Sequence, residues 1–232
     1  MSGLFASWRS VAARQKALLK RVKHPVARRY LETPLPDKHC QVEKVQFLSL
    51  DFETTGLKSR SEAILSMGYT HLSAGRLIMR DSAHHVIRLN TRLPADSVVI
   101  HRITDDRMQT GMPLHSALDK LMNQMCGRVL LVHYAGIERD FLREAMQRVY
   151  GVVLPFLLVD TLQLEKRRLD RLQRPVAENQ LRLANLRRQY RLPRYGAHNA
   201  LEDAIATAEL FLAELAQLQQ RKPTIKLGDI LC

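Results

Sequence analysis

Apolar runs separated by turn residues predict three strands in the first half of the chain. Val45–Leu50 is a compact apolar run that ends at Asp51, which is typical of a buried strand. Ala63–Leu72 and Leu77–Leu89 predict two more strands, and Ser73-Ala74-Gly75 between them predicts a hairpin turn.

Helical periodicity dominates the second half. Pro113 opens a predicted helix in which apolar residues recur about every 3.6 positions. Short apolar runs predict strands at Arg128–His133 and Phe156–Val159, with a helix over Gly136–Tyr150 between them. Three strands close in sequence, followed by alternating helix and strand, favour a mixed α/β sheet flanked by helices.

The last helix has the clearest signal. An apolar stripe extends from Leu201 to Leu218, and Asn199 with Glu202 three residues later resembles a capping box, so the helix should begin at Asn199. The segment Glu165–Gln180 is polar and basic with a break at Pro175, and residues after Gln220 are expected to form a loose tail.

Three parts of the chain are predicted. Residues 1–44 form a basic N-terminal extension, in which Leu4–Val22 could be an amphipathic helix, followed by a stretch with Pro25, Pro34 and Pro36. Residues 45–220 form the folded domain, and residues 221–232 form the C-terminal tail.

Composition adds a charge surplus. The 232 residues include 36 Lys or Arg and 23 Asp or Glu, a net charge of +13, which favours nucleic acid first and an anionic membrane surface second. Two basic segments are candidate phosphate-binding patches. One is residues 1–44, and the other is the run Lys166, Arg167, Arg168, Arg171 and Arg174, for which a solvated face is an equal alternative.

Localisation is inferred from what the sequence lacks. It has no apolar run long enough to span a membrane. The first thirty residues hold eight Lys or Arg, no acid and no secretory core, although an organelle transit segment stays open. Cys40, Cys126 and Cys232 lie far apart, which favours a reducing compartment and, by default, the cytoplasm.

Acidic residues cluster at three predicted element ends. Asp51 and Glu53 follow the first strand with one residue between them, so alternation puts both on one face. His198 precedes the last helix and Asp203 lies in its first turn, while Glu138 and Asp140 open the helix after His133. Each cluster alone could be a solvated strand end or acids that complement a helix dipole.

Phosphodiester hydrolysis gives one reason to combine them. Two divalent ions about 3.5–4 Å apart can activate a water and stabilise the leaving oxygen. Such ions need converging carboxylates, and a histidine is a natural proton acceptor near neutral pH.

Three segments resemble the DEDD (DnaQ-like) exonuclease superfamily, which includes the proofreading subunit of bacterial replicative DNA polymerase. They are Phe47–Leu57 (FLSLDFETTGL), His133–Leu142 and His198–Phe211 (HNALEDAIATAELF), and His101-Arg102-Ile103-Thr104 and Leu158–Leu162 also lie where the family has similar pieces. The resemblance covers about residues 45–216, and the histidine five residues before Asp203 places the chain in the histidine branch.

The resemblance implies an RNase H-like fold with a five-stranded mixed sheet and a 3′→5′ exonuclease. It implies two Mg²⁺ or Mn²⁺ ions on Asp51, Glu53, Glu138 and Asp203, with His198 as general base. The implied substrate contacts are Thr54, Thr55, Gly56, His101, Ile103 and His133. The implied partner is nucleic acid with a free 3′ end, single-stranded DNA first and RNA second, without a membrane; association with a polymerase stays open.

Four departures from the family pattern leave an alternative. Glu138 replaces the usual Asp of the second motif, with Tyr134 and Ile137 replacing Asn and Phe, and Arg102 replaces a Gly. A catalytically weakened nucleic-acid-binding module of the same fold is therefore the main alternative, and a membrane-surface protein is a more distant one.

Overall fold

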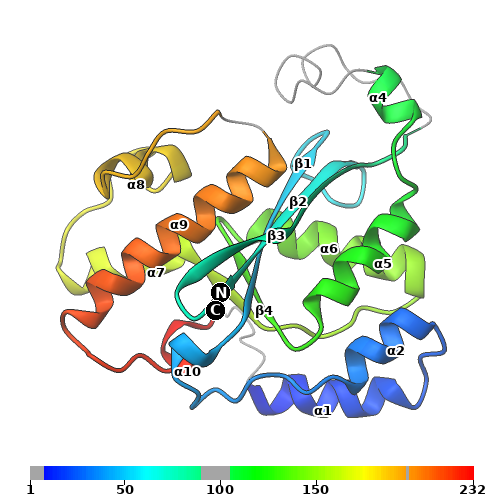
Figure 1. The fold of residues 1–232 in the computed structure, drawn as a ribbon, viewed down its shortest axis with the longest axis horizontal. Coiled ribbons are helices and arrows are strands. Elements are labelled where there is room, and N and C mark those ends of the chain that lie inside the picture. The colour runs from blue at the N-terminus through cyan, green and yellow to red at the C-terminus, as the bar shows by residue number, and fades with distance from the viewer. Residues whose placement is uncertain (1–7, 90–104, 197–198) are drawn as a thin grey trace.

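The computed structural model describes residues 8–89, 105–196 and 199–232 and contains a five-stranded mixed sheet (Figure 1). Strand order is β3-β2-β1-β4-β5, with β1 antiparallel to β2 and parallel to β4. The parallel strands β1, β4 and β5 end at the same edge. The strands are β1 (Phe47–Thr54), β2 (Ile64–Ser73), β3 (Arg76–Val86), β4 (Val129–Val132) and β5 (Leu158–Asp160).

Side chains along β1 point alternately to the two faces of the sheet, so the strand contributes to a hydrophobic core on each face. Leu48 and Leu50 pack in the core that includes apolar residues of α5 (Leu114–Met125) and α6 (Gly136–Tyr150). Phe47 packs in the other core against α9 (Ala200–Gln219), with 5.1 Å between its ring and that of Phe211. Asp51 and Glu53 share the face of Phe47 and therefore point toward α9.

The predicted strands and the helix over Gly136–Tyr150 are confirmed, with strand ends displaced by one to four residues. The helix start is confirmed too, because the Asn199 side chain accepts hydrogen bonds from the backbone N–H groups of Leu201 and Glu202. The sequence pattern did not predict six further helical segments among the described residues, which are α2 (Pro25–Glu32), the 3-10 turn η1 (Val42–Lys44), α4 (Asp105–Gln109), α7 (Thr161–Arg171), α8 (Leu183–Gln189) and α10 (Leu227–Ile230).

The prediction of a loose tail after Gln220 is wrong. Ile225, Leu227 and Ile230 are buried in the core that also contains Phe211 and Leu215 of α9. Leu227 and Ile230 are the first and last residues of α10. The backbone N–H of Val42 also donates to the Ile225 carbonyl at 2.9 Å, so the C-terminal residues pair with the segment that leads into β1. The domain boundaries at residues 44 and 220 stay a prediction.

The N-terminal segment folds as two helices against the domain. α1 (Trp8–Leu19) and α2 (Pro25–Glu32) form a helical hairpin, and α2 packs on α5 (Figure 1). Tyr30 is 1% exposed, and its hydroxyl donates to the Pro155 carbonyl at 2.9 Å. The described part of the predicted N-terminal helix is thus confirmed, and it is anchored rather than free. No helix of the described residues is long and apolar enough to cross a membrane.

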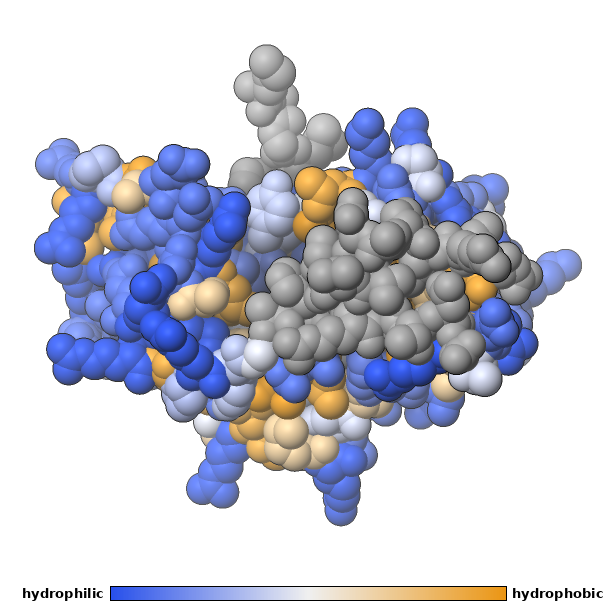
Figure 2. All heavy atoms as spheres, turned by 90° about the horizontal axis from the view of Figure 1, so that it is seen from above, coloured by the Kyte–Doolittle hydropathy of each residue, from blue (hydrophilic) through white to orange (hydrophobic). Residues whose placement is uncertain are grey.

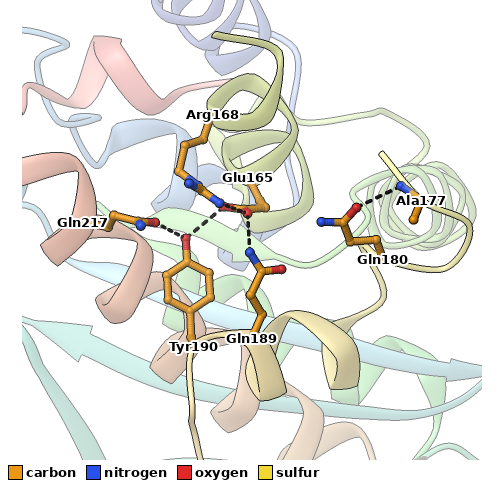
Figure 3. Close-up of polar contacts among 7 residues, drawn as sticks. All are labelled: Glu165, Arg168, Ala177, Gln180, Gln189, Tyr190 and Gln217. Carbon is orange, nitrogen blue, oxygen red and sulfur yellow. Dashed lines mark hydrogen bonds and ion pairs between the residues drawn. The ribbon is translucent and has the colours of Figure 1, made fainter. Parts of the chain in front are cut away.

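A polar cluster ties α7, α8 and α9 together (Figure 3). The Glu165 carboxylate is buried, and Arg168 donates to its Oε2 at 2.7 Å, as does the Tyr190 hydroxyl at 2.9 Å. The Tyr190 hydroxyl also lies 2.6 Å from Oε1 of Gln217 on α9. These bonds hold α7 and α8 beside the long helix.

The start of α9 lies directly against β2 at Gly68. A Cβ on Gly68 would lie 2.1 Å from both the Ala200 carbonyl carbon and the Leu201 nitrogen. Gly68 is opposite Asp51 in the β1–β2 register. The missing side chain therefore lets the first turn of α9 approach the strand that carries Asp51.

We predict that Gly68→Ala lowers the free energy of unfolding by roughly 1–3 kcal/mol, the usual cost of overpacking. The new methyl group would meet backbone atoms of α9 rather than the end of a flexible side chain, so the backbone itself would have to move. Urea unfolding measures the change. Gly136→Ala is the control, since its Cβ would meet only Tyr134 at 4.0 Å. Equal stability of the two variants would contradict the close contact.

Candidate active site

Three carboxylates converge where β1 ends and α9 begins. Asp51 and Glu53 come from β1 and Asp203 from the first turn of α9, and one oxygen of each lies within 4.8 Å of the others. Among the described residues, these three form the group of His, Cys, Asp or Glu that could hold a metal ion. The sequence prediction that Asp51, Glu53 and Asp203 lie together therefore agrees with the geometry.

Crowding of like charges defines the electrostatics of this cluster. Burial raises the pKa of the Asp51 carboxyl well above its usual value, and Glu138, Asp203 and Glu53, in that order, raise it further. Three carboxylates this close need a proton or a cation between them. Oxygen donors of this kind suit hard divalent ions such as Mg²⁺ or Mn²⁺.

Glu138 lies beside this group. It is 4% exposed, its Oε2 atom is buried without a hydrogen-bond partner, and burial raises its pKa to about 8. Asp140 is exposed and pairs with Arg139 at 3.1 Å. Residues two positions apart on a helix are rotated by about 200° about its axis, which explains why Glu138 points inward and Asp140 points outward. A buried carboxylate oxygen without a partner fits a role as a fourth metal ligand.

Asp160 is a positioning residue, although the sequence offers it only as a reserve carboxylate should neither Glu138 nor Asp140 complete the metal site. Its carboxylate accepts hydrogen bonds from the backbone N–H groups of Tyr134 and Ala135, each at 3.0 Å, and of Leu162 at 2.9 Å. It thereby caps α7 and fixes the turn between β4 and α6, three residues before Glu138. The signal available in the sequence was an Asp at the end of a short strand, which is a favoured N-cap residue.

His133 links three segments of the protein. Its Nδ1 lies 2.7 Å from the Thr161 hydroxyl, and its Nε2 lies 2.9 Å from the Leu181 carbonyl. These contacts hold the start of α7 and the segment at Leu181 against the end of β4. The substrate contact expected at His133 stays a prediction.

The loop after β1 is folded back on itself. The Thr54 hydroxyl donates to the Gly56 carbonyl at 2.7 Å, and the Thr55 N–H donates to the Ala63 carbonyl at 3.0 Å. These bonds fix the backbone directly after Glu53, where substrate contacts by Thr54, Thr55 and Gly56 are predicted. The predictions for His101, Ile103 and His198 lie outside the described residues.

Figure 2 looks onto the end of the sheet at which β1 finishes. The described surface on this face is mainly hydrophilic, with small hydrophobic patches. Two large side chains in the loops after β1 and β4 are exposed, Leu57 at 78% and Tyr134 at 56%.

Comparisons with known proteins agree with this geometry. A family model for exonucleases, RNase T, matches residues 48–211. The epsilon subunit of DNA polymerase III from Treponema pallidum is 30% identical over 174 residues, 75% of this chain and 78% of that protein. A PolC-type DNA polymerase III from Thermotoga petrophila is 26% identical over 81% of this chain, which spans 13% of that protein.

Solved structures share the fold. The nuclease domain of 3′hExo, a DEDDh family member bound to rAMP, has a TM-score of 0.64 at 17% identity, over 77% of this chain and 95% of that one. Exonuclease I of E. coli in complex with an oligonucleotide has a TM-score of 0.64 at 15% identity, over 80% of this chain and 42% of that one.

The five-stranded mixed sheet with its flanking helices is the RNase H-like fold of nucleases, and the carboxylate cluster lies at the end of its central strand. The chain belongs to the RNase T family of DnaQ-like exonucleases. The resemblance read from the sequence is thus confirmed.

Glu138 and Asp140 give a direct test of the site. Glu138→Gln keeps the size and removes the charge, so we predict that it abolishes most nuclease activity, with a loss of at least about 10²-fold. Glu138→Asp should retain activity, and Asp140→Asn is the matched control, because its carboxylate is exposed and paired with Arg139. Turnover of a labelled oligonucleotide measures all three. Loss of activity in Asp140→Asn but not in Glu138→Gln would overturn the assignment.

Proposed function

We propose that this chain is a 3′→5′ exonuclease that binds two divalent ions, Mg²⁺ or Mn²⁺, and releases nucleoside monophosphates. The observation that carries the proposal is the convergence of the Asp51, Glu53 and Asp203 oxygens within 4.8 Å, with the buried, unpartnered oxygen of Glu138 beside them. Carboxylates that converge in a partly buried place repel one another until a proton or a cation compensates their charge, and divalent ions match oxygen ligands of this kind.

The residues divide the chemistry between them. Asp51, Glu53, Glu138 and Asp203 would hold the ions, which would activate a water and stabilise the leaving oxygen. His198 accepts a proton from the attacking water. The backbone at Thr54, Thr55 and Gly56 holds the terminal nucleotide, and the phosphodiester bond behind that nucleotide breaks. Residues His101 and Ile103 contact the same strand.

Substrate and direction rest on the relatives. The Treponema pallidum relative is a DNA polymerase III subunit, and a 25% identical relative from Staphylococcus haemolyticus is the 3′-5′ exonuclease DinG. We therefore propose single-stranded DNA as substrate, with RNA as the second candidate, and a cytoplasmic role in DNA replication or repair. Association with a polymerase is a further part of the proposal supported by the epsilon relative.

Metal dependence and direction are tested together. Hydrolysis of DNA labelled at its 5′ end should stop with chelator and return with Mg²⁺ or Mn²⁺, because the carboxylates need a cation. The labelled strand should shorten one nucleotide at a time while the label stays on it. DNA labelled at the 3′ end should release a labelled mononucleotide at once. Cleavage that persists in chelator, or early loss of a 5′ label, would refute the proposal.

His198 is tested at the chemical step. A general base contributes about 10²–10⁴-fold to the rate, so His198→Ala should lower kcat by that factor. Substrate affinity measured with Ca²⁺ in place of Mg²⁺ should stay nearly unchanged. His39→Ala, which replaces an exposed histidine remote in sequence, is the control. Unchanged turnover in His198→Ala would mean that another group accepts the proton.

A further inference from the structure

The exposed charged side chains of the α1–α2 hairpin are almost all positive. Seven cations of residues 11–33 are exposed, and Glu32 is the single acid of that range. Glu32 pairs with Arg28 at 3.0 Å, and Arg29 contacts Asn123. The five others have no acidic partner among the described residues, and we call them the hairpin cations: Arg14, Lys16, Lys20, Arg21 and Lys23.

The opposite side of the hairpin is fixed to the domain. Val22, Ala27 and Leu31 are buried in the core that α5 and α6 share. The Tyr30 hydroxyl adds the hydrogen bond to Pro155. The hairpin cations are therefore carried on a packed element, on the exposed part of α1 and in the turn that leads to α2, rather than on a free extension.

The second basic run of the sequence is different. Lys166 pairs with Asp170 at 2.9 Å, and Arg168 pairs with the buried Glu165 (Figure 3). Arg167 donates to the Leu231 carbonyl at 3.1 Å. Three of its five cations thus have partners within the protein, so the structure favours the hairpin as the phosphate-binding patch.

The hairpin lies at the other end of the molecule from the end of β1 and the start of α9, the two elements that carry Asp51, Glu53 and Asp203 (Figure 1). The ring of His24, between α1 and α2, lies 4.7 Å from that of Tyr150, the last residue of α6. Glu138 is in the first turn of the same helix, twelve residues before Tyr150. At 1.5 Å per residue, about 18 Å of helix separates Glu138 from Tyr150. Hairpin and active site cannot touch the same nucleotide.

We propose that the hairpin cations bind the phosphodiester backbone of a nucleic acid whose 3′ end occupies the active site. Lys20, Arg21 and Lys23 lie within four residues of one another in the turn between α1 and α2, so their positive charges repel one another. A polyanion removes that repulsion and gains free energy by releasing the counterions of its phosphates. The substrate in this inference rests on the proposed exonuclease function.

The test uses two triple variants of equal charge. Arg14→Gln/Lys20→Gln/Lys23→Gln removes three hairpin cations, and Arg76→Gln/Arg80→Gln/Arg221→Gln removes three exposed cations elsewhere. All six side chains are on the surface, so both variants should fold, which thermal unfolding checks. The substrates are two single-stranded DNAs. One has about 30 nucleotides. The other is a dinucleotide, whose single phosphodiester bond is the one that the active site would cleave, so it leaves no phosphate for the hairpin.

The hairpin variant should bind the long DNA more weakly, and its salt slope should flatten by roughly 0.7 per lost contact, about 2 in total. Its kcat and KM on the short DNA should match those of the wild type, and the control variant should match the wild type on both. A salt slope equal to that of the control, or an equal loss on the short DNA, would overturn the proposal. Binding by the hairpin to anionic vesicles but not to DNA would also overturn it.

Binding of the long DNA is measured in chelator, where no hydrolysis is expected. If the hairpin variant loses affinity although the wild type never hydrolyses DNA, the hairpin inference stands and the exonuclease proposal fails. If hydrolysis occurs as proposed and the two variants bind alike, the hairpin inference alone fails.

Discussion

The contact between the start of α9 and β2 at Gly68 determines where the active site can form. A helix packed on a sheet is normally held away from the strands by the side chains between them. Here the backbone of Ala200 and Leu201 comes so close that a methyl group on Gly68 has no room. The Ser49 hydroxyl adds a hydrogen bond to the Ala204 carbonyl at 2.7 Å. These contacts bring the first turn of α9, and with it Asp203, to the strand that carries the other two acids.

Holding these acids together costs stability, which other parts of the fold must offset. Burial and mutual repulsion raise the pKa of Asp51 well above its usual value, so its charged form is disfavoured without a cation. The elements that carry the acids are fixed by contacts outside the cluster. Phe47 packs on Phe211, Asn199 caps α9, and the three hydrogen bonds to Asp160 fix the turn before Glu138. A cation would enter a site that is already formed.

Local sequence patterns predicted most of the sheet and the orientation of the acidic residues on β1 and α6. Alternation placed Asp51 and Glu53 on one face, and the 100° step of a helix separated Glu138 from Asp140. The environment of His133 could not be read in the same way, because its partners are 28 and 48 residues away along the chain. The sequence does not predict α7, because only a few apolar residues, such as Leu164 and Leu169, lie among its charged residues. The buried face of α7 packs against α9, a contact that the local pattern does not indicate. The C-terminal residues were mistaken for a loose tail because only three-dimensional packing buries Ile225 and Leu227.

The distribution of charge creates a problem that the catalytic site cannot solve alone. A cluster of carboxylates repels a polyanion until cations occupy it, and even two divalent ions only balance four carboxylates. Net attraction for nucleic acid must therefore come from basic residues elsewhere in the chain, whose surplus is +13. Many described arginines are paired with acids, as Arg168 is with Glu165 and Arg187 with Glu209. Unpaired cations on an anchored element contribute most to such attraction, and the α1–α2 hairpin is an element of that kind.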